Sequence, residues 1–291
     1  MKTYVLTFIF ALCSLSASAQ LLWKVSGNNA KSESYIFGTH HVAPYSITDS
    51  IRGFNDAINS VQTIIGEVNL ANINQNRVQQ LTMNHALAPT DSLLTLLLTT
   101  QQVDSLNCVL SKYTQGQLTA EMLTQLKPAM ISTMLTLYQT STFFPEFNQE
   151  DQLDGKILNL GHNLGKELDG FESLEEQLSF LFDSPLHVQA QQLMETVRHD
   201  SEAVDTAKNL AYAYMNQNLQ KIEEIMSAEM QNESDFAKRL ITDRNKRWLS
   251  KLESILPEKS AFIVVGCGHL PGKDGLLEGL KNKGYKVEAV K

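Results

Sequence analysis

The chain has little cysteine and a deficit of positive charge, and each lack excludes a class of protein. Three cysteines occur in 291 residues, and only Cys108 and Cys267 lie beyond the N-terminal segment. Two cysteines do not make a disulfide framework, so we expect both to be free thiols. Lysine and arginine number 24 against 32 aspartates and glutamates, which gives a formal charge of −8. This balance argues against nucleic acid as a partner, because its binding depends on basic side chains that neutralise phosphates.

Several familiar catalytic motifs are also missing. The sequence contains no Gly-x-Ser-x-Gly elbow, no phosphate loop and no His-Glu-x-x-His helix. Serine-hydrolase and nucleotide-binding functions are therefore without support. Four histidines are scattered through stretches of helical pattern without a partner three or four residues away, and we interpret them as ordinary helix or surface residues: His85, His162, His187 and His199.

The first residues have the pattern of an export signal. Lys2 precedes an apolar run over 4–12, and small residues follow, ending at Ala19. A basic start, a short apolar core and an A-x-A end predict a secretory signal that is cleaved after Ala19. A lipoprotein anchor at Cys13 is the alternative, although Leu12 stands where a small residue is expected. No later run approaches the roughly 20 apolar residues of a membrane span. We therefore predict an exported chain, periplasmic or secreted, without a transmembrane segment.

The remaining residues predict an α/β fold with an α+β tendency. We expect a small mixed sheet, formed from the two ends of the chain and covered by a large helical middle. The predicted strands are 21–25, 34–37, 61–68, 167–171, 261–265 and 285–290. The first two flank a Gly/Asn turn and suggest a hairpin, and the order strand, helix, strand at the C-terminus predicts a right-handed crossover. We expect one domain over 20–291.

Helical pattern fills two long regions between these strands. The first, about 73–165, is expected to be a helical insertion, and the second covers about 173–256. Ser173 and Glu176 have the form of a capping box at the start of the second region. The individual helices that we predict are 51–60, 91–113, 118–138, 149–164, one that opens with Pro185 at its first position, and 274–283.

Four chemically active side chains follow predicted strands. His41 closes Gly38-Thr39-His40-His41, and His269 closes Gly266-Cys267-Gly268-His269. Glu67 and Glu172 also stand where predicted strands end. Because sites in open α/β sheets form at the carboxyl ends of strands, we expect these four side chains to meet in one crevice. Glycines beside the histidines allow sharp turns and a close approach of the backbone to a ligand.

Two imidazoles and two carboxylates are a suitable ligand set for a divalent Zn, Mn, Co or Fe ion. Three of them would hold the ion and leave a position for a water that is activated for attack. The fourth, a glutamate, would then act as general base. Each motif alone also has an ordinary explanation, such as a hydrogen bond within the turn, a surface carboxylate at Glu67, or Glu172 at the positive end of the next helix. Spacing alone does not decide between the two.

The ordered set of motifs resembles the TraB/GumN family. The residues that carry the resemblance are 35–41, the strand ending in Glu67, Phe171-Glu172 with Glu176-Gln177-Leu178, Asp243-Arg244-Asn245, 266–272 with Gly275-Leu276-Leu277, and Gly284-Tyr285. This family is related to the Tiki metalloproteases and to erythromycin esterase-like and ChaN-like proteins. The resemblance implies a divalent-metal site at His41, His269, Glu67 and Glu172, with Glu67 and Glu172 as catalytic carboxylates.

The resemblance also adds residues around this site. It implies a catalytic Arg244, which would grip a carboxylate or a polarised carbonyl, whereas a salt bridge on a helix face is the ordinary alternative. Asn245, Gly38, Thr39, Gly266 and Gly268 would support the site. His40 stands where the family often has an apolar residue. It is either a substitute ligand or points away, because adjacent residues leave an extended chain in opposite directions.

The function that the resemblance implies is an exported metal-dependent hydrolase, of the Tiki-like metallopeptidase type, that acts on a peptide or small molecule. The alternative is a protein of the same fold that binds a metal, haem or a peptide signal without turnover. TraB-like relatives are associated with the inhibition of peptide pheromone signals, which suits either function. Hydrolysis of an ester is a third alternative.

Overall fold

The computed structural model describes residues 20–69, 73–147, 152–232 and 238–291. The predicted export signal and the alternative anchor at Cys13 lie outside these residues. In the described part of the chain, six strands form one sheet in the order β4-β3-β5-β2-β1-β6. The strands are β1 (Leu22–Ser26), β2 (Ser34–Thr39), β3 (Thr63–Val68), β4 (Glu167–Glu172), β5 (Ala261–Gly266) and β6 (Lys286–Ala289).

The sheet is mixed, as predicted, with a parallel part and an antiparallel edge. β2, β5, β3 and β4 are parallel, whereas β1 pairs antiparallel with both β2 and β6. The predicted hairpin is confirmed, with Leu22 opposite Phe37. Its turn contains Gly27 with a positive φ of 78°, which glycine adopts without steric cost. β5 and β6 do not lie side by side, because β2 and β1 separate them.

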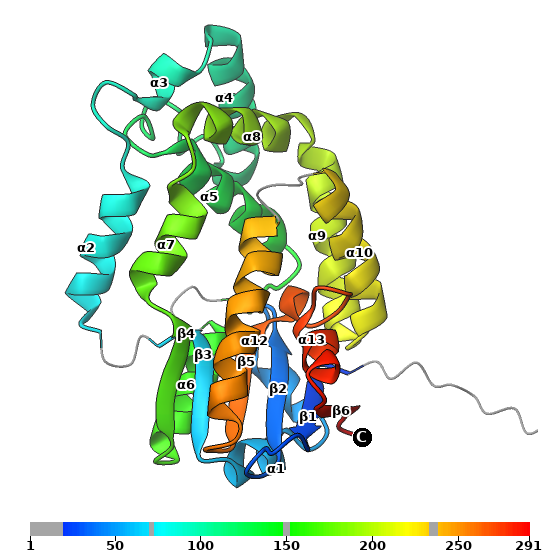
Figure 1. Cartoon of the computed structure of the whole chain (residues 1–291). Coiled ribbons are helices and arrows are strands. Elements are labelled where there is room, and N and C mark those ends of the chain that lie inside the picture. Colours follow the sequence, from blue (N-terminus) through cyan, green and yellow to red (C-terminus); the bar gives the residue numbers. More distant parts are fainter. Residues whose placement is uncertain (1–19, 70–72, 148–151, 233–237) are drawn as a thin grey trace, which may run out of the picture.

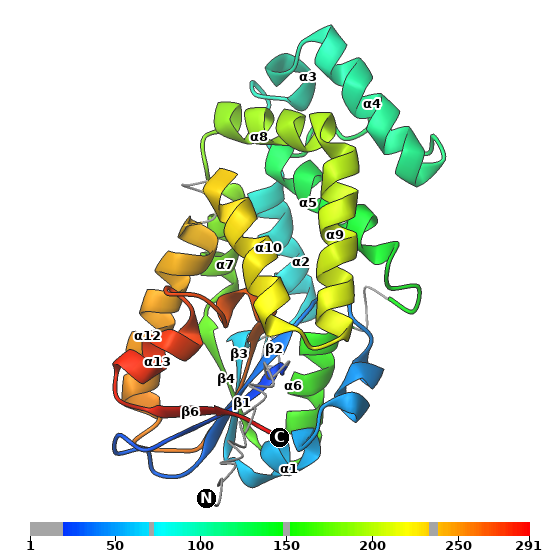
Figure 2. The same cartoon turned by 90° about the vertical axis from the view of Figure 1, so that its right-hand side faces the viewer.

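Helices cover both faces of the sheet (Figure 1 and Figure 2). α1 (Phe54–Ser60) and α6 (Leu153–Asn163) lie on one face, and α12 (Asp243–Ile255) and α13 (Leu276–Asn282) lie on the other. Most of the helical middle rises from one end of the sheet, where the parallel strands finish. It comprises α2 (Gln75–Ala86), α3 (Leu94–Leu97), α4 (Thr100–Thr114), α5 (Pro128–Ser141), α7 (Leu174–Phe182), α8 (Leu186–Arg198), α9 (Asp200–Met215) and α10 (Leu219–Asn232).

Two predicted helices are wrong in their extent. The stretch 91–113 forms two helices, α3 and α4, because Thr99 starts a new helix with a capping box to Gln102. In the stretch 118–138, helix begins only at Pro128, whose missing N–H is tolerated in a first turn. The helical spacing of the leucines continues across Thr99 and Pro128, so this spacing alone does not show where the new helices begin. The predicted capping box of Ser173 and Glu176 is confirmed at the start of α7.

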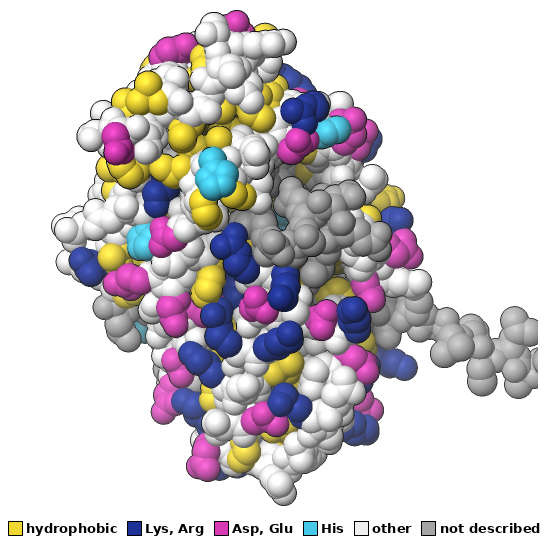
Figure 3. All heavy atoms as spheres, turned by 45° about the horizontal axis from the view of Figure 1, so that its top comes forward, with side chains coloured by type: hydrophobic (Ala, Val, Ile, Leu, Met, Phe, Trp, Pro, Cys, Tyr) yellow, Lys and Arg dark blue, Asp and Glu magenta, His cyan; other side chains and the backbone are white. Residues whose placement is uncertain are grey.

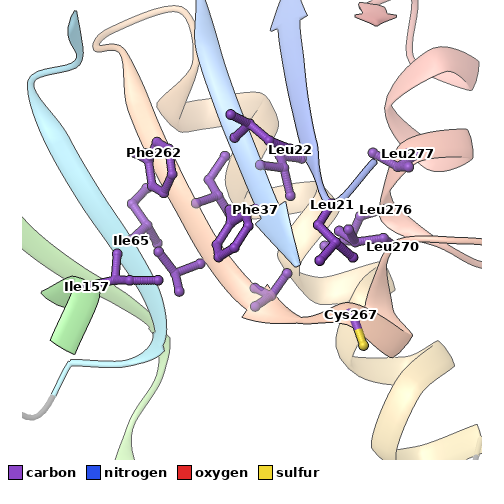
Figure 4. Close-up of a cluster of buried hydrophobic side chains, with 14 of the residues drawn as sticks. Leu21, Leu22, Phe37, Ile65, Ile157, Phe262, Cys267, Leu270, Leu276 and Leu277 are labelled. Carbon is purple, nitrogen blue, oxygen red and sulfur yellow. The ribbon is translucent and has the colours of Figure 1, made fainter. Parts of the chain in front are cut away.

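The central strands are buried on both faces. Phe262, Ile263 and Val265 of β5 have no exposed surface, as expected for a strand inside a covered parallel sheet. Figure 4 shows side chains of strands, helices and the turn after β5 gathered in this layer: Leu21, Leu22, Phe37, Ile65, Ile157, Phe262, Cys267, Leu270, Leu276 and Leu277. The helical end has its own buried cluster around Leu106, Ile131 and Leu193.

The surface differs between the two ends of the molecule. Figure 3 shows exposed hydrophobic side chains mainly over the helical end, while basic and acidic side chains intermingle over the half that contains the sheet. Leu96 and Met122 are the most exposed leucine and methionine there, at 67% and 65%. Within the described ranges, no helix is both long and apolar enough for a membrane span.

Candidate functional site

The carboxyl ends of the four parallel strands meet at one edge, and the sheet register sets their relative heights. Thr39, the last residue of β2, lies opposite Gly266, the last residue of β5. Val68 at the end of β3 lies opposite Glu172 at the end of β4. Along the chain, His41 follows the end of β2 by two residues. His269 closes the short turn η4 (Cys267–His269), which comes directly after β5.

Three of the four predicted site residues converge beside Gly266. A Cβ atom at Gly266 would lie 3.3 Å from Glu67 Oε1, 3.6 Å from His269 Cδ2 and 4.0 Å from His41 Nε2. Glu67 Oε1 accepts a hydrogen bond from the Gly266 N–H at 2.8 Å and lies 3.8 Å from His269 Nε2. The missing side chain of Gly266 thus leaves a small space that both histidines and Glu67 face.

Asn245 fixes the tautomer of the buried His269. The Asn245 Nδ2 donates to the backbone oxygens of His269 at 3.2 Å and Asp274 at 2.8 Å, so its Oδ1 must face His269 Nδ1, 2.7 Å away. An amide oxygen accepts only, and Nδ1 therefore carries the proton. Burial lowers the pKa of His269 to about 4. The neutral ring then presents an unprotonated Nε2 toward Glu67.

His41 lies at the rim, where Asp154 holds its ring. The side chain is 61% exposed, and its Nδ1 lies 2.8 Å from Asp154 Oδ2. Asp154 Oδ1 accepts from the hydroxyl of Thr39 at 2.5 Å. The negative charge of Asp154 raises the pKa of His41 to about 9. At neutral pH the His41 ring is therefore a cation with a proton on both nitrogens. A metal ion would have to displace the proton on Nε2.

Arg244 occupies the centre of the site and uses all of its donors inside the protein. Its Nε contacts both oxygens of Glu172 at 3.0 Å, and its Nη2 reaches Glu67 Oε2 at 2.5 Å and Glu172 Oε2 at 3.0 Å. Nη1 lies 3.3 Å from both the Leu240 oxygen and His269 Nε2. A guanidinium has five N–H groups, so in this arrangement none is left for a substrate carbonyl. The structure thus shows Arg244 in salt bridges, buried between Glu67 and Glu172, and its predicted contact with a substrate stays a prediction.

Glu172 is engaged by donors on both oxygens, which does not suit a metal ligand. Its side chain is 3% exposed. In addition to Arg244, its Oε1 accepts from Arg247 Nη2 at 3.2 Å and from the indole N–H of Trp248 at 3.0 Å. These contacts hold α12 against the sheet and occupy both oxygens of Glu172, whose role as a metal ligand stays a prediction.

Glu67 stays ionised despite its burial. Burial alone would raise its pKa, but His269, Arg244 and His41 outweigh burial and lower the pKa to about 2. Its Oε2 also accepts from Gln177 Nε2 at 3.2 Å. Oε1 has only the Gly266 N–H as a hydrogen-bond partner in the described part of the chain, so this oxygen retains a lone pair on the side of the histidines.

The remaining predicted residues act through packing. His40 packs against the rings of Phe144 and Tyr214, with ring centroids 5.0 and 5.4 Å away, so of the two alternatives the structure shows the one that points away from the ligand set. A Cβ at Gly38 would lie 2.6 Å from Leu270 Cδ1, and one at Gly268 would lie 3.0 Å from Met226 Cε. These glycines permit close packing of the turns rather than contact with a ligand.

Both predicted free thiols are confirmed, with Cys108 exposed and Cys267 buried. Burial raises the pKa of the Cys267 thiol to about 12. Because the thiolate is the strong nucleophile, a thiol with so high a pKa is a weak nucleophile at neutral pH.

Sequence reasoning missed Asp154 and assigned no role to Gln177. Asp154 stands in the first turn of α6, in an acidic stretch that also contains Glu150 and Asp151. Nothing in the local pattern distinguishes it, because its partners Thr39 and His41 lie more than 100 residues away in the chain. Gln177 belongs to one of the family motifs, and this was the only available signal.

The three donor atoms are of the types that bind divalent ions, but the distance between two of them is longer than a bound ion requires. His269 Nε2 and Glu67 Oε1 each have a lone pair near Gly266, and His41 Nε2, also near Gly266, would have one once its proton is lost. Neighbouring donors lie about 3.3 Å apart around a tetrahedral ion with bonds of about 2 Å, against 3.8 Å between His269 Nε2 and Glu67 Oε1. In this arrangement, no three His, Cys, Asp or Glu residues among those described are spaced to hold a metal.

Comparison with known proteins places this geometry in a family. The model of the TraB/PrgY/gumN family matches residues 21–289. A "Metalloprotease TIKI homolog" from Nematostella vectensis is 39% identical over 59 residues, a stretch that covers 19% of this chain and 12% of that protein. No solved structure matches the chain. Because the family match spans both Gly-x-x-His turns and Arg244, the chain belongs to the TraB/PrgY/gumN family.

Proposed function

We propose that this protein is a metal-dependent hydrolase of the Tiki metallopeptidase type, with His41, Glu67 and His269 as the ligands of a divalent ion. One observation carries the proposal: His41 Nε2, His269 Nε2 and Glu67 Oε1 converge beside Gly266, while each histidine has its Nδ1 held by an acceptor. Metal-binding histidines commonly have such a partner on the second nitrogen, because it fixes the tautomer and the ring orientation. The partial similarity to a metalloprotease supports the same assignment.

The bound ion would activate a water and polarise a carbonyl group. The chain's own residues prepare the site for it. Asn245 keeps the proton of His269 on Nδ1, and Arg244 forms buried ion pairs with both Glu67 and Glu172. Arg244 Nη1 and the ion would compete for His269 Nε2, so loading requires the 3.3 Å contact between them to open.

The test measures metal binding and hydrolysis separately. We expect the wild-type protein to bind Mn, Co or Zn in calorimetry and, once loaded, to cleave members of a broad peptide library. His41→Ala and His269→Ala should each abolish cleavage and lower metal affinity. His187→Ala is the matched control, because His187 is an exposed helical histidine away from the strand ends.

The outcomes distinguish this proposal from its rivals. Unchanged metal binding in the His41→Ala, His269→Ala double variant contradicts the shared site. Metal binding without cleavage of peptides or esters would support the alternative of a binding protein. Cleavage of esters alone would retain the site and replace the substrate class.

We also propose that the chain is exported, on the strength of its basic, apolar and small-residue N-terminal pattern. Mass determination of the mature N-terminus after expression with and without a secretion pathway tests this. A terminus at Gln20 is expected, and an intact Met1 in the secreting host contradicts the proposal.

A further inference from the structure

We propose that Asp154 is a positioning residue that determines which nitrogen of His41 faces the site. Its carboxylate bridges two residues at the end of β2: Oδ1 accepts from Thr39, and Oδ2 lies 2.8 Å from His41 Nδ1. A carboxylate at neutral pH has acceptors only. His41 must therefore keep a proton on Nδ1, and Nε2 is the nitrogen available to the site.

Nothing else within the described residues gives the exposed His41 ring a hydrogen bond. His41 lies outside the buried layer, with 61% of its side chain exposed. Packing therefore contributes little to its orientation. An exposed imidazole without a partner would rotate about its side-chain bonds and exchange tautomers, so one directional contact carries a large share of the positioning.

Asp154 is itself held on a rigid support. It stands in the first turn of α6, where the helix N-terminus stabilises negative charge. The neighbouring Leu153 and Ile157 are fully buried and anchor this helix against the sheet. The carboxylate thus joins the positions of two elements, α6 and β2, that are more than 100 residues apart in the chain.

Because Thr39 donates to Asp154, replacing this carboxylate with an amide should change the tautomer of His41. The Thr39 hydroxyl is buried and has one proton, and its acceptors are Asp154 Oδ1 at 2.5 Å and the Val265 backbone oxygen at 3.2 Å. In Asp154→Asn, we expect the amide oxygen to keep the 2.5 Å bond from Thr39, because the opposite orientation, with Thr39 accepting from the amide, leaves the hydroxyl proton only the longer contact to Val265 at 3.2 Å. The amide N–H would then point at His41 and donate to Nδ1, so the proton of the neutral ring would move to Nε2, which can no longer bind a metal.

The experiment compares Asp154→Asn with Asp154→Ala. Nitrogen-15 NMR of the neutral His41 ring, recorded at the alkaline end of a pH titration, should show the proton on Nδ1 in the wild type and on Nε2 in Asp154→Asn. Zinc calorimetry at neutral pH should show a loss of affinity of about 100-fold in Asp154→Asn and of about 10-fold in Asp154→Ala. Adding Thr39→Val to Asp154→Asn frees the amide to turn its oxygen toward His41, and should recover part of the loss.

The matched control is Asp56→Asn, an exposed acid in the first turn of α1, which should change neither readout. The inference is overturned if the His41 tautomer is the same in Asp154→Asn as in the wild type, or if Asp154→Ala loses as much affinity as Asp154→Asn. The inference depends on the proposed function in one respect only, namely that Nε2 of His41 binds the metal ion. A wild type with the expected tautomer that neither binds metal nor cleaves peptides would refute that function and leave the inference standing.

Discussion

Asn245 clamps His269 from both sides, because its amide oxygen lies 2.7 Å from the ring Nδ1 while its amide nitrogen donates to the backbone oxygen of the same residue. The neighbouring Arg244 binds both glutamates from the same turn of α12. A single turn of helix therefore sets the tautomer of one histidine and holds two carboxylates in buried ion pairs.

Asn245→Leu removes this clamp with little change in volume. Zinc affinity should fall by about 10- to 100-fold, since a ligating histidine loses its orienting partner. The free energy of unfolding should fall by about 1–3 kcal/mol, because buried polar groups are left without a hydrogen bond. Calorimetry and urea denaturation measure the two effects. Asn59→Leu, at an exposed asparagine of α1, is the control, and wild-type affinity in a folded Asn245→Leu protein would refute the clamp.

Glu172→Gln should destabilise the protein without directly removing a metal ligand. The change leaves Arg244 with one carboxylate in place of two and weakens the bond from Trp248. Breaking a buried ion pair by changing one partner costs about 3–5 kcal/mol, which thermal or urea unfolding will detect. Glu175→Gln, in an exposed pair with Arg77 at 3.5 Å, should cost less than about 1 kcal/mol. Equal effects of the two substitutions would contradict the role of Glu172.

Stability of the metal-free protein should be greatest near pH 6.5. Burial lowers the pKa of His269 from 6.5 to about 4, so between these values the unfolded chain binds a proton that the folded chain rejects, and stability falls as the pH drops. The pKa of Glu67 is lowered from 4.5 to about 2, so Glu67 adds to the loss of stability as the pH falls below 4.5. His41 has the opposite sign, because Asp154 raises its pKa from 6.5 to about 9, and its contribution disappears as the pH rises through that range.

Urea midpoints measured from pH 4 to pH 10 will check this profile. His269→Gln isolates the contribution of His269 from those of the other histidines, because it should flatten the slope between pH 6.5 and pH 4 relative to the wild type. Parallel slopes for the two proteins in that range would contradict the assignment. Asp154→Asn should likewise flatten the alkaline side, where the His41–Asp154 pair contributes.

Strands were more predictable from the sequence than helices, for a physical reason. β5 is a short apolar run between turn residues, and its burial on both faces leaves a pattern that any reader of the sequence can recognise. Helix boundaries in the middle of the chain depend instead on local caps such as Thr99 and on the first-turn proline Pro128. These single residues are hidden inside leucine-rich stretches whose spacing remains helical throughout.

The candidate site divides in a similar way. His41, Glu67 and His269 were identifiable because parallel strands deliver their carboxyl ends to one edge. The partners of these residues come from helices, and helix packing is not encoded in strand spacing. Asp154 reaches His41 from α6, and Arg244 turns inward to Glu172 rather than outward to a substrate. The sequence pattern therefore predicted which strand ends lie together, and tertiary packing decided which hydrogen-bond partners the side chains there have.

Gly266→Ala offers the most direct test of the space that the three ligands share. The backbone at Gly266 has φ −53° and ψ 136°, a conformation open to alanine, so the protein should fold. Its new methyl group would lie 3.3 Å from Glu67 Oε1 and 4.0 Å from His41 Nε2, inside the space where the donors must approach one another. We expect zinc affinity to fall at least about 10-fold, because the loss of one ligand's geometry has an effect of that order, with little change in melting temperature.

Gly155→Ala is the matched control for this substitution. A Cβ at Gly155 would meet nothing within 4 Å, and the residue lies in α6 beside Asp154. Alanine in a helix should stabilise the protein by about 0.5–1 kcal/mol relative to glycine and leave zinc binding intact. If Gly266→Ala binds zinc as the wild type does, the ion does not lie between His41, Glu67 and His269, and the shared space beside Gly266 has another purpose.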